Sequence, residues 1–377
     1  MSYQNVGTPR FYVSILQFLK SIGALRVELV EPTYLDHFKY VSGKPFEEKD
    51  LSNFIDIDPS NQIYFNGFDE GTKLSIKFMP YHKWHFYRTK KQFSAFLGHS
   101  FMNANIRIGI ESDFEAAFGI QHEVVNSNVT FTADLPDYIS QTVTMASDGF
   151  SITTSDYDDI ANDEGGGSYN LFFDNMRIDD NTGKTKTFIL GSFLQGSYYD
   201  LPHSPELNIT MTRELDGISK SRTDSGSDLT NISYLRPTDW GDLAAWEIGG
   251  SHAARENQNL TRIGRRIWDL SFSYFDSKDL MGINQSLSNI YDVESGYDTG
   301  VLEGISSFDT RVTLHDSFFS QVIYKTNGGQ LPFIFQPDNS NNNTDQFAIC
   351  KLDMDTFSFE QVAKGLYNIK LKIREVW

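Results

Sequence analysis

Two histidines and a group of carboxylates are the residues of this 377-residue chain whose types and spacing suggest metal chemistry. His82 and His85 lie three residues apart in His-Lys-Trp-His, a spacing that suits metal ligands on one face of a helix. The surrounding sequence is typical of a loop or strand, and no third ligand is marked beside them. We therefore expect ordinary surface histidines and no metal site.

The carboxylates gather in residues 156–167, DYDDIANDEGGG, and are Asp156, Asp158, Asp159, Asp163 and Glu164. Such hard oxygen ligands suit calcium. The spacing differs from that of a helix–loop–helix calcium site, because Ile160 occupies the third ligand position and no glycine follows in register. We expect a long exposed loop, with a weak calcium site as the alternative.

No pattern in the chain indicates catalysis. The sequence has no G-x-S-x-G, H-E-x-x-H, Walker loop or strand-borne G-x-G-x-x-G, and no nucleophile–base constellation rises above background. A pair of carboxylates for glycoside hydrolysis is identified by its separation in space, which a sequence does not give. We predict a protein that is not an enzyme and needs no cofactor or metal, with a glycan depolymerase as a remaining alternative.

Tryptophans are the candidates for recognition, either by stacking on sugars or by anchoring an interface. Trp268 lies in a run of strict alternation and is expected in the core. Trp240 and Trp246 belong to Pro-Thr-Asp-Trp-Gly-Asp-Leu-Ala-Ala-Trp, which predicts an irregular loop. These two residues are therefore our candidate interface residues, because exposed tryptophans often dominate binding between subunits.

The elements that must position these residues are predicted to be mainly β-strands. Phe and Tyr are abundant, at 30 and 18 residues, and small polar residues interrupt the apolar runs at short intervals. In residues 9–23, Phe11, Ile15, Phe18 and Ile22 recur at helical spacing before Gly23, which predicts one short amphipathic helix. The alternative for this segment is an extended arm on a neighbouring subunit.

Strand patterns fill most of the remaining chain. The clearest is the closing segment, where Tyr367, Ile369, Leu371 and Ile373 alternate with polar residues and predict a strand with one buried face. The other predicted strands are residues 25–30, 62–65, 73–79, 104–110, 128–132, 149–154, 171–178, 188–191, 206–212, 231–235, 268–274, 320–324, 331–335 and 347–352. Short, regularly spaced strands of this kind are typical of a sandwich or jelly roll.

Charge and cysteine content limit the partners and the compartment. The formal net charge of −18 repels phosphate backbones, so we expect no nucleic-acid partner. Cys350 is the sole cysteine, which excludes an intrachain disulfide and a multi-cysteine zinc site. The first residues lack the pattern of a signal peptide, and no apolar run approaches the ~20 residues that cross a bilayer. We expect synthesis in a reducing cytoplasm and no membrane insertion.

Several segments resemble parts of phage tail proteins. Residues 97–108, Leu-Gly-His-Ser-Phe-Met-Asn-Ala-Asn-Ile-Arg-Ile, resemble a turn and strand of discoidin-like, galactose-binding jelly rolls. Residues 187–236 and 262–377 are similar to the part that follows such a module in tail-tip proteins of the distal tail type. The segments that carry this second resemblance are FILGSFLQG at 188–196, GRRIWDLSFSY at 264–274, LPFIF at 331–335 and YNIKLKIRE at 367–375. The sugar-binding residues of the module are not mapped onto this chain.

This resemblance implies an all-β, mainly antiparallel protein of three parts: an N-terminal helix or arm (1–49), a jelly-roll module (50–186) and a distal-tail-like β domain (187–377). It also implies a structural part of a virion, made in the host cytoplasm. The expected partners are copies of the chain itself, in a ring that the resemblance implies to be sixfold, and other tail proteins, joining the tail tube to the host-facing tip. The alternative is a carbohydrate-binding module that attaches to a host-surface glycan.

Overall fold

The computed structural model describes most of the two ends of the chain and separate strands between them. The described residues are 5–30, 35, 38–40, 44–58, 63–66, 74–80, 91–99, 106–112, 119–125, 128–133, 138–145, 150–157, 169–174, 187–214, 218–232, 239–240, 243–244, 265–281, 316–342 and 346–376.

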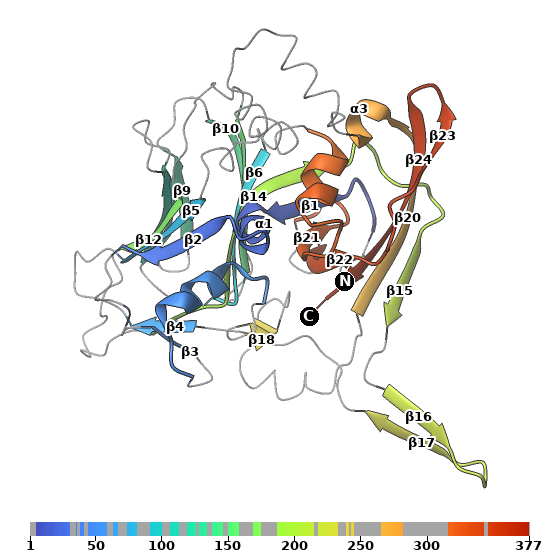
Figure 1. Ribbon diagram of the computed structural model, residues 1–377, viewed down its shortest axis with the longest axis horizontal. Helices are drawn as coiled ribbons and strands as arrows, with labels where there is room; N and C mark the ends of the chain where they lie inside the picture. The colour runs from blue at the N-terminus through green and yellow to red at the C-terminus, as the bar shows by residue number, and fades with distance from the viewer. Residues whose placement is uncertain are drawn as a thin grey trace.

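The protein has an all-β fold, as predicted, and every strand pairing recorded among the described residues is antiparallel. The largest sheet has eleven strands. Its order is β10 (Tyr138–Met145), β11 (Phe150–Tyr157), β6 (Lys91–Leu97), β14 (Ser192–Asp200), β1 (Arg10–Ser14), β21 (Phe333–Gln336), β22 (Ala348–Leu352), β24 (Leu366–Glu375), β20 (Arg265–Asp276) and β15 (Thr210–Glu214), with β23 (Phe359–Ala363) paired beside β24. The strands β20, β24 and β15 form one flank of the molecule (Figure 1).

Smaller sheets complete the architecture. A six-stranded sheet has the order β2 (Leu25–Leu29), β5 (Leu74–Pro80), β12 (Tyr169–Asp174), β7 (Ile106–Ser112), β8 (Gly119–Val125) and β9 (Asn128–Ala133). A three-stranded sheet contains β13 (Thr187–Leu190), β4 (Ile63–Asn66) and β3 (Phe38–Tyr40). Two hairpins, β16 (Ile218–Arg222) with β17 (Asp228–Ile232) and β18 (Asp239–Trp240) with β19 (Leu243–Ala244), stand apart from these sheets.

The three predicted domains share main-chain hydrogen bonds. Strand β14 pairs on one edge with β6 and on the other with β1, so the middle of the large sheet draws one strand from each of the ranges 1–49, 50–186 and 187–377. Strand β13 likewise pairs with β4 across the predicted boundary at residue 187. The jelly-roll arrangement and the three-domain division remain predictions, and these pairings tie the three ranges together.

The N-terminal helix is shorter than predicted. Residues Arg10–Ser14 form strand β1, and helix α1 spans Ile15–Ser21. The Ser14 side chain accepts a hydrogen bond from the backbone N–H of Gln17 and so caps the helix at this point. Phe11, Tyr12 and Val13 are all buried, because β1 runs between β14 and β21 with both of its faces covered. The apolar residues that mimic helical spacing therefore belong to two different elements.

One predicted strand is wrong, and another begins later than predicted. Residues Phe319–Tyr324 form a π-helix, η5, although Val322 and Ile323 favour a strand by propensity. The strand predicted at 206–212 is β15, which begins later, at Thr210, and Leu207 before it is fully exposed. The other helices are the 3₁₀-helix η2 (Glu48–Ile55) and the single turn α3 (Ser277–Leu280), so the described residues contain more than one helix.

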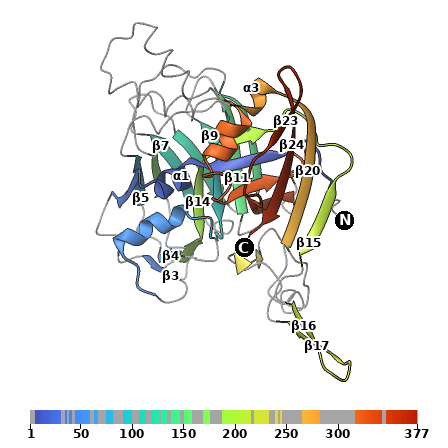
Figure 2. The ribbon, with the colours of Figure 1, turned by 45° about the vertical axis from the view of Figure 1, so that its right-hand side comes forward.

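The closing strand behaves as its alternation predicts. In β24, Ile369, Leu371 and Ile373 are buried, and the lysines between them are exposed. The strand pairs with β20, whose Trp268 is fully buried in the same cluster of apolar side chains. In the view turned by 45°, β20 and β24 run together near the edge where β15 also lies, away from α1 (Figure 2). Both the buried face of the closing strand and the core position of Trp268 are confirmed.

Candidate functional site on strand β14

Strand β14 is the element through which the distant parts of the chain meet. From Ser192 to Tyr199 every residue is buried, because neighbouring strands flank both edges and side chains cover both faces. Gly196 allows the backbones of β14 and β1 to approach closely, since a Cβ atom there would lie 2.0 Å from the carbonyl oxygen of Val13. Polar side chains at the carboxyl end of the strand point alternately to its two faces.

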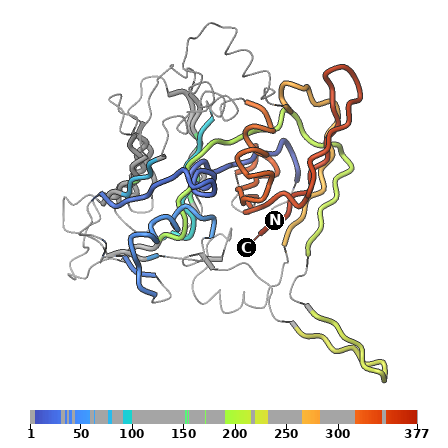
Figure 3. Tube along the Cα trace, in the orientation of Figure 1, coloured from blue at the N-terminus to red at the C-terminus, as the bar shows by residue number. Residues whose placement is uncertain are grey.

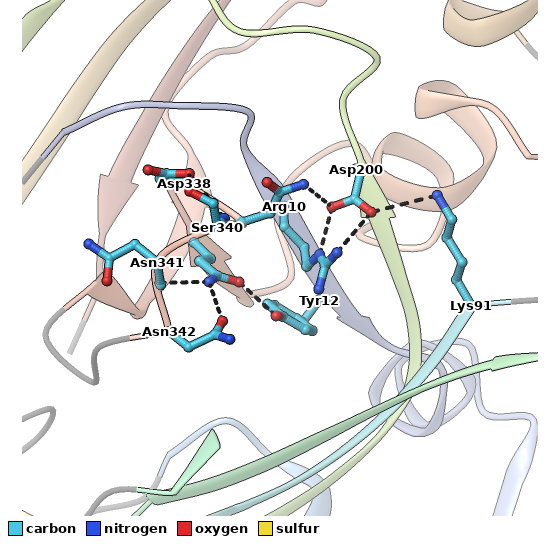
Figure 4. Close-up of polar contacts among 10 residues, drawn as sticks. Arg10, Tyr12, Lys91, Asp200, Asp338, Ser340, Asn341 and Asn342 are labelled. Atoms are coloured by element: carbon cyan, nitrogen blue, oxygen red, sulfur yellow. Dashed lines mark hydrogen bonds and ion pairs between the residues drawn. The ribbon is translucent and has the colours of Figure 1, made fainter. Parts of the chain in front are cut away.

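Asp200 organises a cluster of charges at the end of β14 (Figure 4). Arg10 of β1 donates two hydrogen bonds to its carboxylate, from Nε to Oδ1 at 2.6 Å and from Nη2 to Oδ2 at 3.0 Å. Asn339 donates its Nδ2 to Oδ1 at 3.0 Å, and Lys91 Nζ lies 3.6 Å from Oδ2. The guanidinium also lies over the ring of Tyr198, 4.3 Å from its centroid. The Asp200 carboxylate therefore connects β14 to β1, to β6 and to the loop after β21.

The electrostatics of this cluster favour the charged forms of both Asp200 and Arg10. Burial alone would raise the pKa of Asp200, but the hydrogen bonds and charge of Arg10, with help from Asn339 and Lys91, lower that pKa below its ordinary value. Burial alone would lower the pKa of the Arg10 guanidinium, but its hydrogen bonds to Asp200 and the charge of that carboxylate raise it. Both charges are therefore present at all ordinary pH values, as a fixed ion pair and not as a proton donor or acceptor.

A chain of neutral hydrogen bonds continues from this cluster. The Tyr12 hydroxyl donates to Gln336 Oε1 at 2.7 Å, and Gln336 Nε2 donates to the Asn341 carbonyl at 2.9 Å and to Asn342 Oδ1 at 3.1 Å. Burial raises the pKa of Tyr12 to about 12, which keeps the hydroxyl protonated as a donor. Figure 4 shows Tyr12 of β1 on one side of this chain of hydrogen bonds and Asn341 and Asn342 on the other.

The opposite face of β14 carries a second polar group, centred on Ser197. Lys325, which follows η5, donates from Nζ to Ser197 Oγ at 3.0 Å and to Gln321 Oε1 at 2.6 Å. Ser197 Oγ in turn donates to Gln321 Oε1 at 2.9 Å. The three side chains, which we call the Lys325 cluster, are 3–5% exposed. Burial lowers the pKa of Lys325 to about 7, against a weaker opposing effect of the Asp316 carboxylate.

A neutral amine beside a serine hydroxyl is an arrangement that can activate a nucleophile. Such chemistry requires a substrate at the serine, and the burial of Ser197 and Lys325 keeps substrates away from both atoms. A similar enclosure applies to His99, whose Nε2 lies 2.7 Å from Ser151 Oγ with the imidazole fully buried. These contacts connect segments of the chain, and none of them opens to solvent.

The sequence-predicted site residues lie elsewhere. Trp240 is in the two-residue strand β18 opposite Leu243, so the predicted irregular loop contains a short strand pair. Trp246, His82 and His85 lie outside the described residues. Asp156 belongs to strand β11 rather than to the predicted loop, and the other carboxylates of that group also lie outside the described residues. Among the side chains that the structure describes, no group of three or more His, Cys, Asp or Glu could hold a metal ion.

Sequence reasoning missed both groups on β14. Asp200 and Arg10 are charged residues that each lie at the end of a strand, and this position could have marked them as candidates. Their pairing could not be predicted, because 190 residues separate them. Ser197, Gln321 and Lys325 have no distinguishing pattern in the sequence. The Leu97–His99 turn was noted for its resemblance, and Gly98 adopts a left-handed φ of 65° there, yet the contact from His99 to Ser151 was not expected.

The hairpin β16–β17 differs from β14 in its exposure to solvent. It extends away from the body of the molecule (Figures 1 and 3), and its described side chains are exposed except for the half-buried Thr223. Leu229 is 56% exposed. The turn is ordered by its own contacts, because Thr223 Oγ1 accepts from the Ser227 N–H at 3.0 Å and Gly226 supplies a φ of 87°.

Comparison with known protein families, curated proteins and solved structures gave no significant match. None of the helices formed by the described residues has the length and apolar character that crossing a bilayer requires.

Proposed function

We propose that the chain is a structural virion protein of a phage tail tip, which forms a ring between the tail tube and the host-facing tip. The observation that carries this proposal is the hairpin β16–β17, together with the resemblance of the segments at 188–196, 264–274, 331–335 and 367–375. An isolated two-stranded hairpin is marginally stable in water. No described side chain of this hairpin is buried, so we infer that it gains its support from a neighbouring copy.

The rest of the molecule suits such a role. The sheet through β14 fixes distant segments to one another with a bidentate ion pair and buried hydrogen bonds, which makes a rigid body. A rigid body with a projecting element favours heterologous contacts, in which one surface binds a different surface of the next copy, and such contacts close into rings. The enclosure of Ser197 and Lys325 supports a structural role over hydrolysis.

The decisive experiment removes the hairpin. A variant lacking residues 218–232 is compared with the wild-type chain by analytical ultracentrifugation from 1 to 50 μM and by thermal unfolding. We expect closed rings for the wild type and monomers for the variant, and the variant should still unfold in one cooperative transition, because no described side chain of the hairpin is buried.

A pair of point variants gives the matched control. Leu229→Asp places a charge on the hairpin, and Leu207→Asp makes the same change at a fully exposed leucine outside it. We expect the first to abolish the ring and the second to leave it intact. Rings that survive deletion of the hairpin would overturn its role. Electron microscopy of the assembled particle that places the chain away from the tail tip would overturn the proposed function itself.

A further inference from the structure

The Lys325 cluster joins the π-helix segment to the sheet without an ion pair. Lys325 Nζ contacts Ser197 Oγ on β14 and Gln321 Oε1 one helical turn earlier, and neither partner is a carboxylate. Buried lysines are normally paired with an opposite charge, because an unpaired buried charge is costly. This lysine is 3% exposed, so water does not replace the missing partner.

The number of donors and acceptors in the cluster matches a neutral amine. A neutral Nζ carries two hydrogens, which Gln321 Oε1 and Ser197 Oγ accept. An ammonium carries three, and the part of the chain that the structure describes offers no acceptor for the third. Protonation of Lys325 would therefore add both a charge and an unsatisfied donor to a closed site.

Few charged groups act on this lysine. Among the described residues, Asp316, which precedes η5 and is exposed, is the one charge recorded as favouring the ammonium. Strand β14 contributes Ser197 and, two residues on, Tyr199, whose phenol stays neutral because burial raises its pKa. The side chain that η5 itself contributes is the amide of Gln321. The charge of this buried site therefore depends mainly on whether Lys325 is protonated.

The segment that Lys325 secures is also attached to the rest of the molecule by other contacts. Phe318 and Val322 enter the core, Tyr324 packs against Phe18 with ring centroids 5.4 Å apart, and Asn327 Nδ2 donates to Ser21 Oγ at 2.8 Å. The turn after η5 has left-handed backbone at Asn327 and at the two glycines that follow. A π-helix is itself an uncommon conformation that often marks a functional position.

We propose that Lys325, Gln321 and Ser197 form a proton-operated clamp, closed when Lys325 is neutral and released when it is protonated, that controls how tightly residues 317–331 are held on strand β14. The clamp is independent of the ring. It gives the protein a response to acidification near neutral pH, because burial places the titration of Lys325 at about pH 7. The direction follows from linkage: the released lysine regains its ordinary pKa of 10.5, so the open form binds more protons and gains population as the pH falls.

Hydrogen exchange measured by mass spectrometry at pH 6.0 and pH 8.5, corrected for intrinsic exchange rates, tests the clamp in the full-length chain. With pKa values of about 7 when closed and 10.5 when open, linkage gives an opening constant about thirtyfold larger at pH 6.0. We expect a loss of protection of this order in peptides from 317–331 and none in peptides from β20 and β24. In Lys325→Met, which keeps the length of the side chain and cannot be protonated, the protection should be the same at both pH values.

A change of less than threefold in the wild type, or an equal change in Lys325→Met, would overturn the clamp. If the methionine variant does not fold, nuclear magnetic resonance of wild-type protein carrying ¹³C-labelled lysine decides the question. One lysine resonance that titrates within about a unit of pH 7 supports the clamp. Titration of all lysines above pH 9 would contradict it.

Discussion

The pair β20–β24 and the hairpin β16–β17 have the same local structure and opposite surroundings. Both are antiparallel pairs, and the register of β20–β24 shifts once, between Phe272 and Phe275. In the first, every second side chain is buried, with Trp268 and Ile373 facing each other in the core. In the second, no described side chain is buried. Strand geometry is therefore not what stabilises either pair, and the difference lies in the apolar face that β20–β24 has and the hairpin lacks.

The same contrast appears in their ion pairs. Arg266 and Glu375 join β20 to the end of β24 at 3.0 Å, and their side chains are 8% and 5% exposed. Arg266 also donates to the Phe347 carbonyl at 2.9 Å, which satisfies the buried guanidinium further. In the hairpin, Arg222 and Asp228 lie 3.9 Å apart with both side chains largely exposed. The first pair is part of the fold, and the second is a contact between solvated groups.

The largest effect should come from Leu371→Asp in β24. The side chain is 1% exposed, so the change removes about 2–5 kcal/mol of packing and buries a charge without a partner. We expect loss of soluble folded protein, because a typical domain has about 5–15 kcal/mol of stability in total. Expression yield and urea unfolding measure the effect. Leu229→Asp in the hairpin is the matched control and should change the stability of the monomer by less than about 0.5 kcal/mol. Similar losses in both variants would contradict the contrast.

The next effect should come from the buried ion pair. Arg266→Met leaves the Glu375 carboxylate buried without its partner and should lower the free energy of unfolding by about 3–5 kcal/mol. Arg222→Met in the hairpin makes the same chemical change and should cost less than about 1 kcal/mol. Urea unfolding at pH 7 compares the two. A double variant, Arg266→Met with Glu375→Met, should recover much of the loss, and its failure to do so would indicate that packing rather than charge sets the cost.

How far the sequence predicts the fold depends on whether the information is local. The alternation at 367–373 depends on neighbouring residues alone, and the structure confirms its buried face. Phe11 and Val13 are buried because β14 and β21 flank β1, which no pattern within residues 9–23 reveals. Residues 320–324 have β-branched side chains typical of a strand, but Phe318 and Val322 pack into the core from a helical backbone. Tertiary contacts override propensity in both cases.

The polar groups on β14 show the same limit for the candidate site. Ser197 and Lys325 are 128 residues apart, and each alone is an ordinary strand serine or surface-type lysine. Burial is what changes the chemistry of Lys325, and burial is a property of the folded chain. The functional proposal in turn depends on Trp240 and Trp246 less than the sequence suggested, since the hairpin β16–β17 is the projecting element that the structure describes.

The smallest effect, and the one that depends on pH, should come from Asp200, which lies between the two extremes with 19% of its side chain exposed. Asp200→Asn keeps the shape but removes the charge that Arg10 grips, and should lower the free energy of unfolding by about 1–3 kcal/mol at pH 7. Because the folded-state pKa of Asp200 is lowered, its contribution is complete above the unfolded pKa of about 4 and is lost as the pH falls through the folded value.

The difference between the wild type and Asp200→Asn should therefore be constant from pH 7 to about pH 5 and shrink at lower pH. Urea unfolding at pH 7, 5, 4 and 3 follows it. Asp228→Asn in the hairpin supplies the control, since its exposed partner Arg222 gives the carboxylate little to lose at any pH. A difference for Asp200→Asn that persists unchanged at pH 3 would mean that the hydrogen-bonding shape of the side chain, and not its charge, holds β1 against β14.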